Sequence, residues 1–176
     1  MSDKKILIIY FYYILFVFIS AIYFFQLHIN TSASMPIGIY REISQPIIKD
    51  CLVAACLPLP IALFAKQRGY IGNGSCLGNT EPVLKKIVAV GGDEIDVTKQ
   101  GVVINNKLLP HSKVLNFDDQ LRPLASQINT HKKLVAQEIW LYGMTSNKSW
   151  DSRYYGAVEC SQVRAVVVPV WIWSNL

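Results

Sequence analysis

Several patterns that mark common functional sites are missing from this sequence. Its four cysteines include no C-x-x-C pair, so closely spaced zinc ligands are lacking. Lysines and arginines are scattered, with no basic stripe interleaved with aromatic residues, which argues against nucleic acid as a partner. The three histidines sit in no recognisable supporting motif, which weakens a serine-histidine-aspartate triad but leaves it as an alternative. No metal ion or organic cofactor is therefore expected.

Charged residues are also scarce, at 16% of the chain, and apolar residues are concentrated near its start. Ile6–Phe25 carries no charge and is about 20 residues long, enough for a helix that crosses a bilayer. The apolar part of a cleavable signal peptide usually runs only about 7 to 15 residues, so we predict a retained anchor, with cleavage as the alternative. Lys4 and Lys5 precede this segment and favour a cytoplasmic start. We therefore expect residues 1–29 to form a cytoplasmic tail and transmembrane anchor, and residues 30–176 to form one domain outside the cytoplasm.

The rest of the chain is typical of a mainly β domain, because short apolar or alternating runs recur between turn signals. One short helix is expected at Ile61–Arg68, since Gly69 can end it. Asn105-Asn106 predicts a hairpin turn, because asparagine tolerates positive φ. The polar stretch Pro110–Lys133 predicts a long loop that borders a binding site. The expected strands are Cys51–Leu57, Leu84–Val90, Glu94–Val97, Gly101–Ile104, Ile139–Tyr142 and Arg164–Trp173.

The cysteines Cys51, Cys56, Cys76 and Cys160 suggest a structural role. If the domain faces an oxidising compartment, a disulfide that closes the loop between Cys56 and Cys76 is one reading. Small buried thiols are the alternative reading. Four cysteines allow three ways of forming two disulfides, so the sequence leaves the pairing open.

Ser34 follows the predicted anchor closely, in a segment where proline and glycine exclude a continuing helix. An extended chain covers at most about 3.6 Å per residue, so the Ser34 hydroxyl should lie within roughly 25 Å of the bilayer. A serine hydroxyl is a poor nucleophile until a neighbouring group removes its proton. A lysine can do this if burial lowers its pKa from about 10.4 toward neutrality. Neighbouring side chains on a strand face opposite ways, so one lysine of Lys85-Lys86 can point inward, although a charged strand edge is the plainer reading.

Three segments together resemble, in the same order, the signature boxes of type I signal peptidases. They are Ser32-Ala33-Ser34-Met35-Pro36, the run from Lys85-Lys86 to Gly92-Asp93, and Ser149-Trp150-Asp151-Ser152-Arg153-Tyr154-Tyr155-Gly156. The resemblance extends over nearly the whole chain. It implies a signal-peptidase-like β domain on a single N-terminal transmembrane helix.

The resemblance also implies roles for individual residues. Ser34 would be the nucleophile and Lys85 the general base, with Lys86 facing away. Ser32 would join the Ser34 backbone N–H in binding the tetrahedral oxyanion. Ser149 would hydrogen-bond to the base. Asp151 and Arg153 would form a supporting ion pair, although a D-x-R pair taken alone is ordinary surface charge.

Pro36 follows Met35 directly, whereas general signal peptidases place one residue between them and carry larger insertions. The sequence therefore looks closer to the TraF-type conjugative transfer peptidases. This resemblance implies maturation of a membrane-bound pilin precursor during plasmid transfer, by a single-pass protein of the bacterial inner membrane whose catalytic domain lies in the periplasm. Whether the reaction ends in hydrolysis or in cyclisation is left open.

Three rival functions remain. A general type I signal peptidase would remove signal peptides from many exported proteins. A catalytically silent, membrane-anchored assembly protein would keep the fold without needing Ser34, Lys85 and Asp151 together. A self-cleaving regulator also uses a serine-lysine pair, but the chain offers no DNA-binding half.

Overall fold

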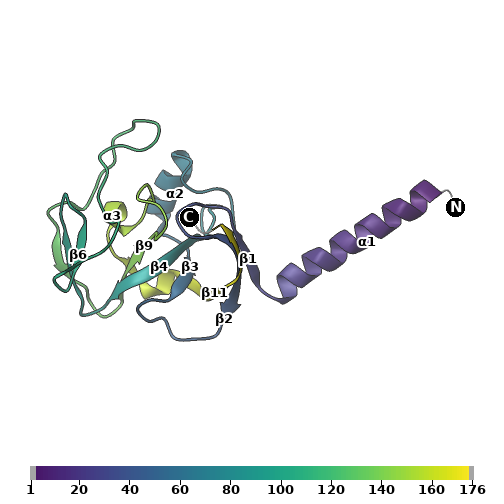
Figure 1. Ribbon diagram of the computed structural model, residues 1–176, viewed down its shortest axis with the longest axis horizontal. Helices are drawn as coiled ribbons and strands as arrows, with labels where there is room; N and C mark the ends of the chain where they lie inside the picture. Colours follow the sequence, from purple (N-terminus) through teal and green to yellow (C-terminus); the bar gives the residue numbers. More distant parts are fainter. Residues whose placement is uncertain (1–2, 175–176) are drawn as a thin grey trace.

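The computed structural model describes residues 3–174, apart from the side chains of residues 3, 21–24 and 174. Helix α1 (Asp3–Phe24) runs away from a β domain that holds the rest of the described chain (Figure 1). No helix within the described part of the chain is long and apolar enough to cross a membrane. The transmembrane helix expected at Ile6–Phe25 is therefore not confirmed, and part of it, the side chains of residues 21–24, lies outside the description.

Most of the domain is β structure, which confirms the mainly β part of the expected fold class. One antiparallel sheet contains, in order from edge to edge, β1 (Leu27–Asn30), β2 (Ile37–Ile43), β11 (Val163–Ser174), β3 (Leu52–Ala55), β4 (Val83–Val90), β9 (Glu138–Tyr142) and β10 (Val158–Glu159). Strand β11, near the carboxyl end, lies between β2 and β3 and joins the early and late parts of the chain.

A smaller antiparallel sheet packs beside the first. Its order is β7 (Lys107–Leu108), β6 (Val102–Ile104), β5 (Glu94–Val97) and β8 (His131–Lys133). Asp93 braces the turn from β4 into β5, because its carboxylate accepts hydrogen bonds from the Val90 N–H and the Asn105 side chain, and its Oδ2 also pairs with Lys49. The aspartate of the second signature box thus joins the two sheets.

Two hydrophobic cores meet at β4. Val83 and Ile87 enter the core that lies under α2 (Leu59–Gln67). Val88 and Ala89 enter the core shared with the smaller sheet. Residues 3–174 include two further short helical segments, α3 (Ser152–Tyr155) and η1 (Cys160–Gln162). Strand β4 therefore occupies a rigid, central place in the domain.

The expected strands correspond to β3, β4, β5, β6, β9 and β11, and the expected helix corresponds to α2. Asn105 and Asn106 both adopt positive φ at the predicted hairpin turn. The stretch Pro110–Lys133 is not loop throughout, because its last residues form β8 and pair with β5. Strands β1 and β2 are not among the expected strands, because proline and glycine in this segment exclude only a continuing helix. A Cβ at Gly38 would lie 2.2 Å from the Trp171 carbonyl oxygen, so the glycine instead allows β11 to approach.

The disulfide between Cys56 and Cys76, one of the pairings that the sequence leaves open, is present, with a Cα–Cα distance of 5.5 Å. It joins the end of β3 to the segment after α2. Cys51 and Cys160 are free thiols, buried and half-buried respectively. The disulfide closes the segment that contains α2 and Tyr70, which borders the cavity described below.

Candidate active site

Ser34 lies in a tight turn of residues 31–36 that connects β1 to β2, here called the Ser34 loop. The Ser34 side chain is buried and Ser32 is exposed. The two hydroxyl oxygens lie 3.0 Å apart, and the Ser34 N–H donates to the Ser32 Oγ at 3.3 Å. The loop therefore brings together a hydroxyl, a backbone N–H and a second hydroxyl, the groups that acyl transfer to serine requires.

Lys85 is the inward-facing lysine of the pair on β4. Its side chain is 5% exposed, whereas Lys86 faces the other way and pairs with Asp50 at 2.7 Å. The predicted alternation of the two lysines is thus confirmed. Burial lowers the pKa of the Lys85 amine from 10.5 to about 8, while Asp151 acts to raise this pKa and Arg153 to lower it. A sizeable fraction of the amine is therefore neutral near physiological pH.

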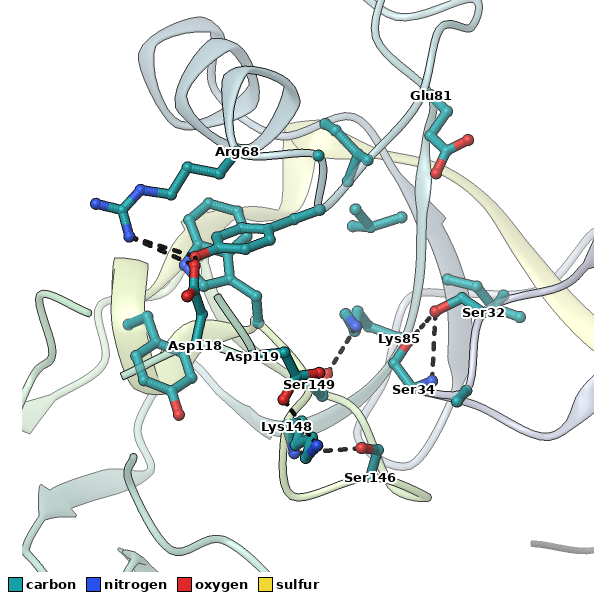
Figure 2. A pocket seen from close by; sticks show the side chains of 18 of the residues that line it. Ser32, Ser34, Arg68, Glu81, Lys85, Asp118, Asp119, Ser146, Lys148 and Ser149 are labelled. Carbon is teal, nitrogen blue, oxygen red and sulfur yellow. Dashed lines mark hydrogen bonds and ion pairs between the residues drawn. The ribbon is translucent and has the colours of Figure 1, made fainter. Parts of the chain in front are cut away.

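The Lys85 Nζ donates a hydrogen bond to the Ser149 Oγ at 2.9 Å. Ser149 is itself buried, in the loop that follows β9. No hydrogen bond joins Lys85 directly to Ser34 within residues 3–174, but both side chains line one cavity (Figure 2). The structure thus brings Ser32, Ser34, Lys85 and Ser149 to one site.

Asp151 and Arg153 form a completely buried ion pair rather than a surface pair. The contact is bidentate, with Nε to Oδ1 at 2.8 Å and Nη2 to Oδ2 at 2.9 Å. Asp151 also caps α3 by accepting the Arg153 N–H, and its Oδ2 accepts the Gly143 N–H at 3.0 Å. The carboxylate therefore fixes both ends of the 143–151 loop that presents Ser149.

Arg153 holds the same loop from inside. Its Nη1 donates to the carbonyls of Lys113 and Asn147, and its Nη2 donates to the Ser149 carbonyl at 2.8 Å. With the bonds to Asp151, every N–H of the guanidinium is used, as a buried arginine requires. The ion pair holds the backbone of Ser149, and the Ser149 side chain accepts the hydrogen bond of Lys85, so the pair helps to fix the position of the Lys85 amine.

Gly143 is a site residue that the sequence reasoning missed. A Cβ built on it would lie 2.0 Å from the Ser149 Oγ and 3.0 Å from the Ser34 carbonyl oxygen. Any side chain here would displace Ser149 from the Lys85 amine. A glycine after an apolar strand is too common for the sequence to reveal this contact, because the contact depends on how β9 meets the Ser34 loop.

The cavity at this site has a volume of about 650 Å³. Ser34, Lys85 and Ser149 lie toward one end, and Arg68 and Asp118 lie across it (Figure 2). Part of the Pro110–Lys133 stretch lines this far side, which confirms that it borders a cavity.

Asp118 organises the far side of the cavity. Its carboxylate accepts hydrogen bonds from the Tyr70 hydroxyl at 2.6 Å and from the Arg122 Nε at 2.7 Å. Although desolvation acts to raise it, these hydrogen bonds lower the pKa of Asp118. The ionised carboxylate therefore ties the loop around residue 118 to the end of α2.

Two of the three histidines pair with carboxylates. His28 lines the cavity, but its Nε2 pairs with Glu42, and His131 pairs with Asp96 on the smaller sheet. None of the hydrogen bonds between described residues joins a histidine to Ser34. The described residues also include no cluster of histidine, cysteine, aspartate or glutamate that could hold a metal ion.

Comparison with known proteins gives consistent matches. A protein-family model described as "Signal peptidase, peptidase S26" matches residues 4–173. The plasmid transfer protein TraF of Escherichia coli is 37% identical over 147 residues, which make up 82% of this chain and 82% of that protein. The probable conjugal transfer protein TraF of Sinorhizobium fredii is 31% identical over 161 residues, covering 89% of this chain and 82% of that protein. Among solved structures, a signal peptidase I from Enterococcus faecalis matches with 17% identity and a TM-score of 0.42, covering 72% of this chain and 99% of that one.

Proposed function

The chain belongs to the signal peptidase family, peptidase S26, and from this premise we propose that it is a serine endopeptidase that cuts a membrane-associated precursor protein. The observation that carries the proposal is the buried Lys85 amine, hydrogen-bonded to Ser149 in the cavity that also holds Ser34. A buried amine without a carboxylate partner lowers stability, and a purely structural protein gains nothing from it.

In the proposed reaction, neutral Lys85 takes the proton of the Ser34 hydroxyl, and the Ser34 oxygen attacks the peptide carbonyl carbon. The negative charge on the carbonyl oxygen is held by the Ser34 N–H and the Ser32 hydroxyl. Collapse of the intermediate breaks the C–N bond, and protonated Lys85 gives its proton to the leaving amine. A water molecule, deprotonated by Lys85, then hydrolyses the ester on Ser34, unless an amine takes its place.

In this scheme Ser149, Asp151 and Arg153 position the Lys85 amine and take no part in the proton transfers themselves. Ser149 holds the amine by accepting its hydrogen bond, which leaves the nitrogen lone pair free for the Ser34 proton. The Asp151–Arg153 pair fixes the backbone on both sides of Ser149.

The names of the relatives support a proposal for the substrate class. Proteins named for plasmid and conjugal transfer share about a third of their residues with this chain over most of its length. We therefore propose that the substrate is a conjugative pilin precursor and that cleavage serves plasmid transfer. A general signal peptidase remains the second candidate because the family model itself carries that description.

A comparison of precursors separates these two functions. A pilin precursor and several unrelated exported precursors would each be incubated with the wild-type protein and with Ser34→Ala, and cleavage followed by gel shift and mass spectrometry. We expect the pilin precursor to be cut at least about 100-fold faster than the others, because the cavity should contact its transition state more favourably. This ratio corresponds to a difference of roughly 2.7 kcal/mol in transition-state binding. Equal rates for all precursors would favour the general signal peptidase.

We also propose that α1 attaches the chain to the bacterial inner membrane, with the catalytic domain on the periplasmic side. The large apolar side chains described on α1 are exposed, and Leu7 is 76% exposed. Near the end of α1, Ile29, Ile39 and Trp171 are cross-strand neighbours on the outer face of the sheet, and Trp171 is 65% exposed. The Cys56–Cys76 disulfide also favours an oxidising compartment.

Cell fractionation tests this attachment. The full chain should sediment with membranes and stay there in high salt, because the attraction is apolar rather than ionic. A variant in which a cleavable signal peptide replaces residues 1–25 should move largely to the supernatant while keeping its Cys56–Cys76 disulfide, because it still reaches the periplasm. The attachment proposal fails if the full chain and the shortened variant partition alike.

A further inference from the structure

Asn30 is the last residue of β1, and its buried side chain is enclosed by the Ser34 loop that follows. The two hydrogens of the Asn30 Nδ2 are shared among three carbonyl oxygens, those of Ser32 at 3.0 Å, Met35 at 3.1 Å and Pro36 at 3.0 Å. The Asn30 Oδ1 accepts the Ser32 N–H at 3.2 Å. One amide group thus holds both ends of the loop, because it combines donors with an acceptor.

Thr145 contacts the middle of the same loop from the 143–151 loop. Its N–H donates to the Ser34 carbonyl at 3.3 Å, and its Oγ1 donates to the Ala33 carbonyl. Together, Asn30 and Thr145 bind every carbonyl oxygen from Ser32 to Pro36. No carbonyl from Ser32 to Pro36 is therefore left free to turn into the cavity.

This arrangement decides which way the Ser34 N–H points. In a trans peptide the C=O and the following N–H point in opposite directions. Because Thr145 holds the Ala33 carbonyl on its own side, the Ser34 N–H must face the other side, where it meets the Ser32 Oγ. A flip of this peptide would put a carbonyl oxygen where the substrate's oxyanion should bind.

We propose that Asn30 and Thr145 are positioning residues that clamp the Ser34 loop so that the Ser34 N–H serves as an oxyanion donor. The inference rests on the proposed function. Loss of the clamp should raise the energy of the transition state, because the Ser34 N–H binds the tetrahedral oxyanion more strongly than it binds the carbonyl oxygen of the bound substrate. Its loss should lower kcat with little effect on KM or on the ionisation of Lys85.

Thr145→Val tests the clamp with little change in shape, because valine replaces the hydroxyl by a methyl group. A quenched fluorescent peptide that spans the mapped cleavage site would report kcat and KM. We expect kcat to fall about 100-fold, the effect of losing one oxyanion donor, with KM and the pH midpoint near 8 unchanged. Thr145→Ser keeps the donor and should keep kcat within about threefold of wild type.

Asn30→Asp tests the other half, because a carboxylate cannot donate to three carbonyl oxygens. Asn105→Asp is the matched control: Asn105 also holds a turn, through Asp93, but on the smaller sheet. Asn105→Asp should lower the melting temperature and leave kcat per folded molecule unchanged. Asn30→Asp should lower kcat about 100-fold in the molecules that remain folded.

The outcomes are distinct. If Asn30→Asp does not fold, Thr145→Val decides alone: wild-type kcat would overturn the clamp, and a selective loss of kcat would support it. A parallel loss of stability and activity in Thr145→Val, not rescued by serine, would also overturn it. Equal cutting by wild type and Ser34→Ala would overturn the proposed function and the clamp with it.

Discussion

Replacing Lys85 by methionine should abolish cleavage while the protein stays folded. Methionine nearly matches the lysine stem in length but has no amine to accept the Ser34 proton. We expect kcat to fall by about 10⁴-fold, the upper end of what a general base contributes. The matched control is Lys86→Met, which removes the neighbouring amine that pairs with exposed Asp50. Lys86→Met should keep kcat within about twofold, since surface ion pairs contribute little.

The pH dependence of kcat/KM of the wild-type protein also tests whether Lys85 is the base. Lys85 must be neutral to act as a base, and its pKa is lowered to about 8. We therefore expect kcat/KM to fall tenfold for each pH unit below about 8 and to level off above it. A profile that is flat from pH 6 to 9 would exclude Lys85 as the base.

Stability should change in the opposite direction to activity in Lys85→Met. The folded-state pKa of Lys85 lies below the usual 10.5, so between about 8 and 10.5 the unfolded chain binds the extra proton and stability rises with pH. Below about 8, burying the amine costs about 3 kcal/mol. Lys85→Met should therefore be more stable than wild type at pH 7, and this gain should fade as the pH rises to 10.5. Urea denaturation at several pH values measures it.

Replacing Asp151 by alanine should both unfold the site and stop cleavage. The Arg153 guanidinium is fully buried, so removing its carboxylate leaves an uncompensated charge, at a cost of about 3–5 kcal/mol. The Gly143 N–H also loses its acceptor, and α3 loses its cap. We expect a lower denaturation midpoint and no detectable product.

Two further variants check this explanation. Asp119→Ala breaks an ion pair with Lys148 in which both side chains are largely exposed, and it should change stability by less than about 1 kcal/mol. The double variant Asp151→Ala/Arg153→Met removes both buried charges and should recover part of the stability without recovering activity. Full stability in Asp151→Ala alone would contradict the structural role of the pair.

The sequence could predict those site features that depend on local periodicity or on a distinctive motif. Alternation along a strand already places one lysine of Lys85-Lys86 inward, and β4 has this alternation. The third box brings Asp151 and Arg153 within two residues, so a short helix start suffices to pair them. The cysteine spacing allowed the observed disulfide but could not select it.

Other features depend on contacts between distant segments, which no local pattern reports. Thr145 and Ala33 are 112 residues apart in the chain, and their contact exists only because β9 delivers the 143–151 loop to the Ser34 loop. Asn30 resembles a linker residue until the loop folds around its amide. From the sequence, Gly38 only helps to exclude a continuing helix, whereas in the sheet it lets β11 lie close to β2.

The most direct test of the central claim is the processing of a co-expressed pilin precursor by the wild-type protein, by Ser34→Ala and by Lys85→Ala, with mass spectrometry of the product. We predict that the wild type cuts at one site and that neither variant cuts, although circular dichroism shows both to be folded. A product that is lighter by one water than the hydrolysed product would indicate that an amine of the product itself, rather than water, resolves the ester on Ser34. Cleavage by either folded variant at the wild-type rate would contradict the assignment of Ser34 and Lys85 as nucleophile and base.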